Sequence, residues 1–280
     1  MNNTELTDHT IELNGLKISN KYPLTLISGP CQLESLEHAM MIAEKLIEIC
    51  DRNDINFVFK SSFDKANRTS HLSKRGLGID EGLKIFQKLK SSLNISILTD
   101  IHTPQQCELV AKEVDILQIP AFLCRQTDLL LAAGKTGLMI NVKKGQFLAP
   151  WDMKGVVDKL TSTGLPKEKI MLCERGTFFG YNQLVVDYRG LIQMKEFGTQ
   201  ICMDATHCVQ QPGGKGDSSG GNRDYAPYMA YASTIFKPDA IFMETHEDPD
   251  NAPSDGPNMI KLDDMEKVVK TIKAYNDVSV

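Results

Sequence analysis

The sequence lacks the features that mark membrane, secreted and nucleic-acid-binding proteins. No uninterrupted apolar run among its 280 residues is long enough to span a bilayer. Residues 1–15 are polar and do not have the basic-then-apolar layout of a signal peptide. Lys and Arg number 31 against 36 Asp and Glu, and the net charge of −5 argues against nucleic acid or a membrane surface as a partner.

Cysteine does not occur in the patterns that give it a structural role. The seven cysteines are an odd number, and no two of them have the CxxC spacing of a metal or redox motif. Free, buried thiols are typical of a reducing compartment. Together with the missing signal peptide, this usage predicts a cytoplasmic protein.

What the sequence does contain is a repeated unit, in which an apolar run of strand character is followed by a polar break and a helical pattern. Before the first unit, Asn14-Gly15 between two short apolar runs predicts an N-terminal β-hairpin. Eight strand-type runs follow, at residues 24–31, 56–63, 96–102, 116–122, 138–144, 170–176, 199–207 and 240–246.

The segments between these runs have the periodicity of amphipathic helices. In the first segment the apolar stripe consists of Ala39, Ile42, Ala43, Leu46, Ile47 and Cys50, and the last helix is expected at residues 258–274. Eight strand–helix units predict one α/β domain over residues 1–280, a TIM (β/α)8 barrel with a short N-terminal β-hairpin. A doubly wound sheet is the alternative, but Gly29-Pro30-Cys31 does not match the GxGxxG turn of that fold.

Charged side chains gather at the C-terminal ends of the predicted strands, where TIM barrels build their active sites. One subset is cationic and consists of Lys60, Lys65, Arg68, Lys143 and Arg175. So many cations around one mouth predict a ligand with more than one anionic group. For any one of these residues alone, a surface salt bridge is the alternative interpretation.

A second subset of strand-end residues has the donor atoms of a metal site. Cys31, His207, Glu244 and Asp255 offer one sulfur, one nitrogen and carboxylate oxygens, which suit a divalent transition metal. Taken singly, Cys31 is more typical of a small core residue and His207 of a histidine with a hydrogen-bond partner. Their shared position at strand ends favours the metal interpretation.

One long loop, residues 211–224, is rich in glycine and is the longest flexible piece that the sequence predicts. We expect it to close over bound substrates and exclude water that would hydrolyse intermediates. A surface loop with no gating role is the alternative.

The chain resembles the 3-deoxy-D-manno-octulosonate 8-phosphate synthases over nearly its whole length. The matching segments are SGPCQLES (28–35), FKSSFDKANRTS (59–70), LTDIHTPQQ (98–106), LQIPAFLCRQTDLL (117–130), NVKKGQFLAPWDM (141–153), LCERGTFFGYNQLVVDYRG (172–190), DATHCVQQPGG (204–214) and ETHEDPDNAPSDGP (244–257). The resemblance implies a TIM barrel, a homotetramer and a place in lipopolysaccharide biosynthesis.

The resemblance also implies a role for particular residues. The phosphate and carboxylate of phosphoenolpyruvate are expected on Lys60, Lys65, Gln118, Ala121, Lys143 and Arg175. The phosphate of arabinose 5-phosphate is expected on Arg68 and Thr69, with Arg125 reaching in from a neighbouring subunit, and the sugar hydroxyls on Asn67 and Asp100. Cys31, where metal-independent members carry asparagine, implies the metal-dependent class with His207, Glu244 and Asp255 as the other ligands.

The implied reaction is an aldol-type condensation with C–O cleavage. C3 of phosphoenolpyruvate attacks the aldehyde of arabinose 5-phosphate, water adds at C2, and inorganic phosphate leaves. The residues expected to take part in the chemistry are Lys65, as the proton donor to the alkoxide, and the metal-binding Cys31, His207 and Asp255. Fe²⁺, Zn²⁺, Mn²⁺ and Co²⁺ all suit a site with a thiolate ligand.

Two other functions remain open from the sequence. The sister 3-deoxy-D-arabino-heptulosonate 7-phosphate synthases use erythrose 4-phosphate and read Lys-Pro-Arg-Thr-Ser where this chain has residues 65–70. The additional Asn67 is therefore predicted to recognise the longer sugar. A barrel that binds sugar phosphates without catalysis is the other alternative; it predicts the loss of a cation or ligand at some strand end, and the sequence shows no such loss.

Overall fold

The computed structural model describes residues 10–68, 70, 74–214 and 219–279. Its core is a barrel of eight parallel strands: β3 (Thr25–Gly29), β4 (Asn56–Lys60), β5 (Ser96–Asp100), β6 (Ile116–Ile119), β7 (Met139–Lys143), β8 (Ile170–Glu174), β11 (Gln200–Asp204) and β14 (Ala240–His246). Neighbours in the chain are neighbours in the sheet, and β14 pairs with both β11 and β3. This pairing closes the barrel and confirms the predicted TIM fold.

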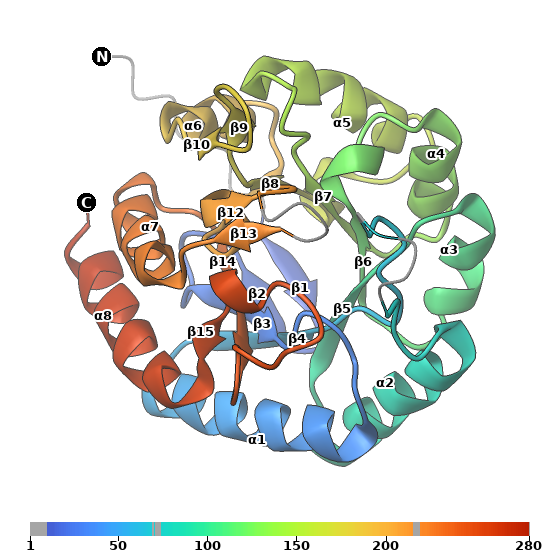
Figure 1. The fold of residues 1–280 in the computed structure, drawn as a ribbon. Coiled ribbons are helices and arrows are strands. Elements are labelled where there is room, and N and C mark those ends of the chain that lie inside the picture. Colours follow the sequence, from blue (N-terminus) through green and yellow to red (C-terminus); the bar gives the residue numbers. More distant parts are fainter. Residues whose placement is uncertain (1–9, 69, 71–73, 215–218, 280) are drawn as a thin grey trace.

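One long helix follows each barrel strand and packs on the outside of the sheet (Figure 1). These helices are α1 (Leu36–Arg52), α2 (Ile79–Leu93), α3 (Pro104–Val110), α4 (Thr127–Lys135), α5 (Lys154–Thr161), α6 (Arg189–Lys195), α7 (Ala226–Ser233) and α8 (Met265–Val278). Among the described residues, no helix has the combined length and apolar character needed to cross a membrane. All seven cysteines are free and buried, as their spacing predicts.

The predicted hairpin covers the N-terminal end of the barrel. Strands β1 (Ile11–Leu13) and β2 (Leu16–Ile18) pair antiparallel across Asn14-Gly15, whose φ values are +50° and +83°. Ile11 and Ile18 are buried in the cluster that fills the barrel interior. The Asn14 side chain also donates a hydrogen bond of 2.9 Å to Asp115 Oδ1. The hairpin therefore covers the N-terminal end of the barrel interior.

Most of the hydrophobic core lies between the sheet and the helices rather than inside the barrel. The buried face of α1 carries Ala39, Ile42, Ala43, Leu46, Ile49 and Cys50. The predicted stripe is thus correct except at Ile47, which is half-buried while Ile49 is fully buried. The larger outer core fixes the helices, and the strands between them carry their C-terminal side chains to one mouth.

The last helix begins later than the sequence pattern predicts. Residues Gly256–Asn258 form a 3-10 turn, and β15 (Ile260–Lys261) then pairs in parallel with the end of β14. Only after this pairing does α8 begin, at Met265. The prediction of helix over residues 258–264 was thus wrong, because tertiary pairing with β14 overrides local helix propensity.

Two short hairpins lie at the C-terminal end of the barrel. Strand β9 (Thr177–Phe178) pairs with β10 (Leu184–Val185), and β12 (Gln210–Gln211) pairs with β13 (Gly220–Gly221). The second hairpin includes part of the loop predicted to act as a lid, residues 211–224. Residues 215–218 of that loop lie outside the described residues. Its described part is thus anchored at both ends by strand pairing.

The close approach of β3 and β4 gives a prediction for Gly29. In Gly29→Ala the new Cβ would lie 2.2 Å from the carbonyl oxygen of Lys60, so the two strands must separate. Overpacking of this kind lowers the free energy of unfolding by about 1–3 kcal/mol, which urea unfolding measures.

Gly155→Ala is the matched control, because no other part of the described residues comes within 4 Å of its added Cβ in α5. This variant should be as stable as the wild type or more stable, since alanine is the better helix former. A Gly29→Ala protein as stable as the wild type would contradict the expected clash.

Candidate active site

A cavity of about 420 Å³ opens at the C-terminal end of the barrel. Its lining includes most of the residues that the sequence assigns to substrates: Lys60, Lys65, Asn67, Arg68, Asp100, Gln118, Ala121, Lys143 and Arg175, together with His207 and Asp255. These residues come from loops and strand ends that are far apart in the sequence. The cavity thus brings together all five residues of the cationic subset and two of the four predicted metal ligands.

Lys60 and Lys143 are buried cations, only 1% and 5% exposed. Lys60 Nζ lies 2.5 Å from Glu244 Oε1, and Lys143 Nζ donates to Asp204 Oδ2. Burial alone disfavours a charged lysine, but the adjacent carboxylate outweighs burial and raises the pKa of each ammonium group. Both lysines are therefore charged at neutral pH where they line the cavity.

Arg175 has hydrogen-bond donors to spare. Its Nη2 donates to Gln210 Oε1 over 3.0 Å. Its Nε and Nη1 are buried and have no hydrogen-bond partner in the part of the chain that the structure describes. Unsatisfied buried donors on a cation are costly, and an anion in the cavity would satisfy them.

Asp100 is the centre of a polar network on the opposite part of the cavity wall. It accepts hydrogen bonds from the Ser62 hydroxyl and from Gln118 Nε2, the latter over 2.5 Å. Asn141 Nδ2 in turn donates to Gln118 Oε1 over 2.8 Å, and Lys65 Nζ to the Ser62 hydroxyl over 3.0 Å. Although burial opposes it, the charges of nearby lysines lower the pKa of Asp100, which is therefore ionised.

The loop after β4 carries the remaining substrate candidates. Arg68 donates to Ser254 Oγ over 2.9 Å and to Gln32 Oε1 over 2.8 Å, so its guanidinium is held in place at the cavity. Asn67 is exposed at the cavity. Thr69 lies outside the described residues. Arg125 is exposed and is not among the described residues that line the cavity of its own chain.

Three of the four predicted metal ligands come together beside the cavity, and the fourth, His207, lies next to two of them. Cys31, Glu244 and Asp255 each offer a ligand atom within 4.8 Å of the other two. His207 Nε2 lies 3.6 Å from Glu244 Oε2 and 3.8 Å from Asp255 Oδ2. Among the described residues Glu244 Oε2 is buried without a hydrogen-bond partner, so a cation there would satisfy an otherwise costly atom.

Burial and charge act in opposite directions on this group. Burial, reinforced by the neighbouring Glu244, strongly raises the pKa of the Cys31 thiol. Burial also opposes ionisation of the half-buried Asp255, but His207 and Lys65 outweigh that effect and lower its pKa to about 2. Without a cation the group therefore holds a protonated thiol beside ionised carboxylates, a donor set that can bind a divalent metal once the thiol loses its proton.

A model of the DAHP synthetase I family matches residues 6–279. The chain belongs to this family. Among its relatives, proteins named 2-dehydro-3-deoxyphosphooctonate aldolase occur in Rickettsia bellii, 56% identical over 96% of this chain and 97% of the relative, and in Bartonella tribocorum, 52% identical over 96% of both chains. A protein of the same name in Rhizobium meliloti is 56% identical over 93% of this chain and 92% of its own length.

In this member of the family Asp204 connects the two halves of the site. One of its oxygens accepts hydrogen bonds from Lys143 and, over 2.8 Å, from His207 Nδ1. The other accepts the backbone N–H groups of Thr206 and His207. Asp204 thereby fixes the His207 ring so that its Nε2 faces Glu244 and Asp255.

Sequence reasoning did not assign Asp204, Ser62 or Asn141 to the site. Asp204 was visible as a strand end, but nothing in the sequence showed that it contacts both Lys143 and His207. Asn141 could have been found, because it is a polar residue inside the otherwise apolar start of β7. Ser62 gives no signal of its own.

Asp204→Asn tests the importance of this connection for stability. The substitution keeps the side-chain volume but leaves the buried Lys143 ammonium without a charged partner. Removing one partner of a buried ion pair lowers the free energy of unfolding by about 3–5 kcal/mol, measurable by urea or thermal unfolding.

The matched control is Asp187→Asn, which removes the exposed ion pair with Arg189. Solvent screens that pair, so the control should unfold like the wild type. Equal stability of the Asp204→Asn protein and the control would show that Lys143 does not depend on Asp204.

Proposed function

We propose that the protein condenses phosphoenolpyruvate with D-arabinose 5-phosphate and water to give 3-deoxy-D-manno-octulosonate 8-phosphate and inorganic phosphate, in lipopolysaccharide biosynthesis. The observation that carries the proposal is the cavity in which Lys60, Lys65, Arg68, Lys143 and Arg175 meet beside the Cys31 group. A doubly phosphorylated substrate pair needs several cations in one place. The names of relatives more than half identical to this chain agree with that substrate pair.

The phosphoenolpyruvate subsite is built from the buried cations. Lys60, Lys143 and the unpartnered donors of Arg175 face the same cavity, so phosphate and carboxylate oxygens can accept from all three. Gln118 and Ala121 line the cavity beside them, and Lys65 lies within reach of both substrates. Because these groups are already charged and held by carboxylates, little reorganisation is needed when the anion binds.

The sugar-phosphate subsite lies toward the exposed rim. Arg68 and Thr69 are proposed to bind the phosphate, and Asn67 and Asp100 the hydroxyl groups of the sugar. Arg125 is proposed to reach this subsite from a neighbouring subunit of a homotetramer, which agrees with its exposed position outside its own cavity. The seven free thiols support a cytoplasmic location.

The reaction follows from this placement. C3 of phosphoenolpyruvate bonds to the aldehyde carbon, the carbonyl electrons move to oxygen, and Lys65 supplies a proton to the alkoxide that forms. Water adds at C2 and loses one proton to leave a hydroxyl. The C2–O bond to the phosphate then breaks, the hydroxyl becomes the C2 carbonyl, and its proton leaves with inorganic phosphate. Lys143 and Arg175 offset the negative charge on the departing phosphate.

Cys31, His207, Glu244 and Asp255 are proposed to hold a divalent metal ion, with Fe²⁺, Zn²⁺, Mn²⁺ and Co²⁺ all suited to the donor set. The residues fit such an ion because Glu244 Oε2 is buried without a hydrogen-bond partner among the described residues. Ligand atoms of Cys31, Glu244 and Asp255 also lie within 4.8 Å of one another, with His207 Nε2 at 3.6 Å from Glu244 Oε2. When bound, a metal supplies Lewis acidity that orients the aldehyde and lowers the pKa of the attacking water. Asp204 keeps His207 in the orientation that this role requires.

The two alternative functions are less well supported. Erythrose 4-phosphate as the substrate would leave the additional Asn67 at the rim without a hydroxyl to bind. A barrel that only binds sugar phosphates would not need the converging Cys31 group beside the cation cluster. Both alternatives are separated from the proposed function by measuring turnover.

Phosphate release in the presence of phosphoenolpyruvate should be faster with arabinose 5-phosphate than with erythrose 4-phosphate. Asn67→Ala should lower kcat/KM for arabinose 5-phosphate by about tenfold, the effect of one lost hydrogen bond of about 1.4 kcal/mol, and leave the KM of phosphoenolpyruvate unchanged. A preference for erythrose 4-phosphate would overturn the substrate assignment, and no turnover of either sugar would favour the binding protein.

The metal assignment predicts loss of turnover after treatment with a strong chelator and recovery when a divalent metal is added. It also predicts proton release. Because burial raises the Cys31 pKa, the thiol keeps its proton through neutral pH, and binding of Zn²⁺ as a thiolate must release it. Affinity at this site should therefore rise about tenfold per pH unit between pH 7 and 8.

Calorimetry in buffers of different ionisation enthalpy counts the protons released. The wild type should release about one more proton per bound ion than Cys31→Asn. Cys50→Ala is the matched control, because Cys50 is an equally buried thiol in the core cluster with α1. Full activity of the chelated protein, or equal proton release by Cys31→Asn and the wild type, would contradict the assignment.

A further inference from the structure

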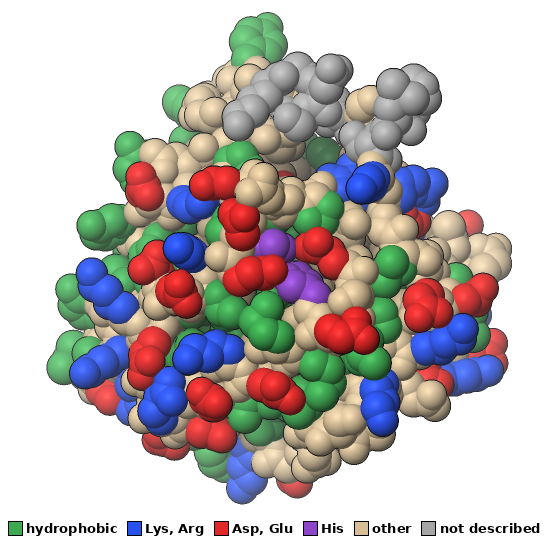
Figure 2. All heavy atoms as spheres, turned by 60° about the horizontal axis from the view of Figure 1, so that its bottom comes forward, with side chains coloured by type: hydrophobic (Ala, Val, Ile, Leu, Met, Phe, Trp, Pro, Cys, Tyr) green, Lys and Arg blue, Asp and Glu red, His purple; other side chains and the backbone are tan. Residues whose placement is uncertain are grey.

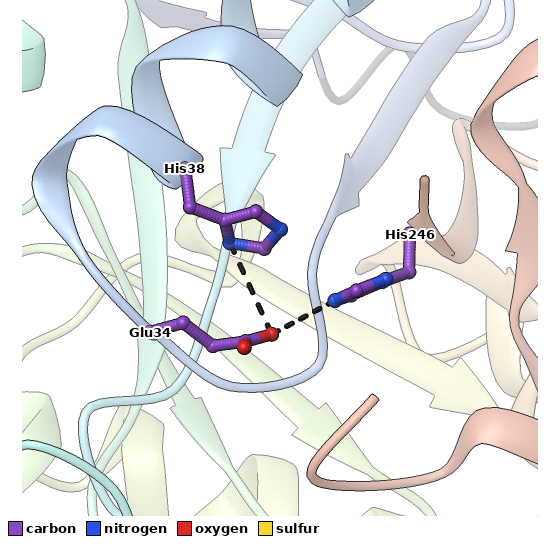
Figure 3. Close-up of side chains that lie close together, drawn as sticks. All are labelled: Glu34, His38 and His246. Atoms are coloured by element: carbon purple, nitrogen blue, oxygen red, sulfur yellow. Dashed lines mark hydrogen bonds and ion pairs between the residues drawn. The ribbon is translucent and has the colours of Figure 1, made fainter. Parts of the chain in front are cut away.

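A second group of imidazole and carboxylate side chains lies beside the barrel mouth, where α1 begins and β14 ends (Figure 3). Glu34 precedes α1, His38 lies in its first turn, and His246 is the last residue of β14. A nitrogen or oxygen atom of each residue lies within 4.8 Å of those of the other two. The proposed function uses none of these side chains.

Glu247 contacts both imidazoles on the side opposite Glu34. Its Oε2 lies 2.8 Å from His38 Nε2 and 3.3 Å from His246 Nδ1. The other ring nitrogens, His38 Nδ1 and His246 Nε2, lie 4.0 Å and 2.8 Å from Glu34 Oε1. Each ring therefore turns one nitrogen to Glu247 and the other to Glu34.

His38 has a lone pair without a partner. When its Nε2–H donates to Glu247, Nδ1 is the unprotonated nitrogen. Nδ1 is buried and accepts no hydrogen bond from the described residues, and the side chain is only 11% exposed. Buried polar atoms are rarely left unpaired, and an imidazole nitrogen held in this way is a ready metal ligand.

His246 can offer its nitrogen after one proton shift. The backbone N–H of Asp248 donates to His246 Nδ1 over 3.0 Å, so Nε2 carries the proton and donates to Glu34. If the proton moves to Nδ1, this N–H can donate a hydrogen bond to Glu247, and Nε2 becomes free to bind a cation. Asp248 is exposed, so water can accept the bond from its N–H.

The distances and charges suit a small divalent cation. Zn²⁺ binds histidine nitrogen and carboxylate oxygen at about 2.0–2.2 Å, which separates tetrahedral ligand atoms by about 3.4 Å. The distances of 2.8 Å and 4.0 Å from Glu34 to the two rings lie on either side of that value. Glu34 and Glu247 also supply two negative charges, and Figure 2 shows histidine side chains surrounded by acidic ones on the face it draws.

We propose that Glu34, His38 and His246 form a second binding site for a divalent transition-metal ion, with Zn²⁺ the best fit. Two imidazoles and one carboxylate are a frequent zinc ligand set. Glu247 orients both rings through the nitrogens that do not face Glu34, as carboxylates often do for histidine ligands of a metal. The site has no sulfur ligand, so it differs in chemistry from the Cys31 group.

An ion at this site joins two segments that also carry ligands of the first group. Cys31 precedes Glu34 in the loop after β3, and Glu244 precedes His246 in β14. The ion would cross-link these segments and so stabilise the fold around the first group. The role of this ion is therefore structural, and the number of bound ions can be measured without any assay of turnover.

The test counts metal ions per chain. Metal-free full-length protein is titrated with Zn²⁺ and, separately, with Co²⁺, whose sulfur-to-cobalt charge-transfer absorption reports only the Cys31 group. The wild type should bind two ions per chain, and His38→Gln and Glu34→Gln one ion with the charge-transfer band kept. Cys31→Ser should bind one ion without the band and should still gain melting temperature with Zn²⁺.

Glu37→Gln is the matched control, because it removes an exposed carboxylate from the same helical turn as His38. It should keep both ions, and circular dichroism shows that each variant is folded. The second site would be overturned if the wild type bound only one ion and Cys31→Ser bound none. It would also be overturned if His38→Gln and Glu34→Gln both still bound two ions. A single ion lost in His38→Gln but kept in Cys31→Ser would support the second site and contradict the first.

Discussion

Buried lysines need carboxylate partners, and this requirement shapes the whole mouth of the barrel. Lys60 and Lys143 could not stay charged at 1% and 5% exposure without Glu244 and Asp204. Lys60 and Glu244 lie on β4 and β14, and Lys143 and Asp204 on β7 and β11, so each ion pair joins two strands that are separated by one other strand. The paired lysines are thereby held ready for an anion before any substrate arrives.

One of these carboxylates, Glu244, is also a proposed metal ligand, and the other, Asp204, contacts the proposed ligand His207, so the lysines and this group share their charges. Glu244 contacts Lys60 through one oxygen and faces His207 with the other. Asp204 contacts Lys143 and His207 with a single oxygen. In the proposed site, a cation held by the Cys31 group would therefore share Glu244 with Lys60. The site acts as one electrostatic unit rather than as two neighbouring ones.

Secondary structure was predicted correctly where it follows from a local sequence pattern. It was predicted wrongly where pairing with a distant segment sets the conformation. The hairpin at Asn14-Gly15, the strand-type runs and the stripe on α1 are local patterns, and the structure contains them. The start of the last helix was wrong, because β15 pairs with β14 instead of continuing as helix. Residue types at strand ends predicted the cavity lining, whereas the contacts of Ser62 with Asp100 and of Asn141 with Gln118 are set by the tertiary structure.

By itself the sequence determined the number of strand–helix units, the end of the barrel that carries the chemistry, and the residue types available there. These follow from periodicity and chain order, which are properties of short segments. Only the tertiary structure decided which charges pair, that Asp204 serves both Lys143 and His207, and that Glu34, His38 and His246 meet. Such contacts join residues far apart in the chain, and the distances between them exist only once the barrel has closed.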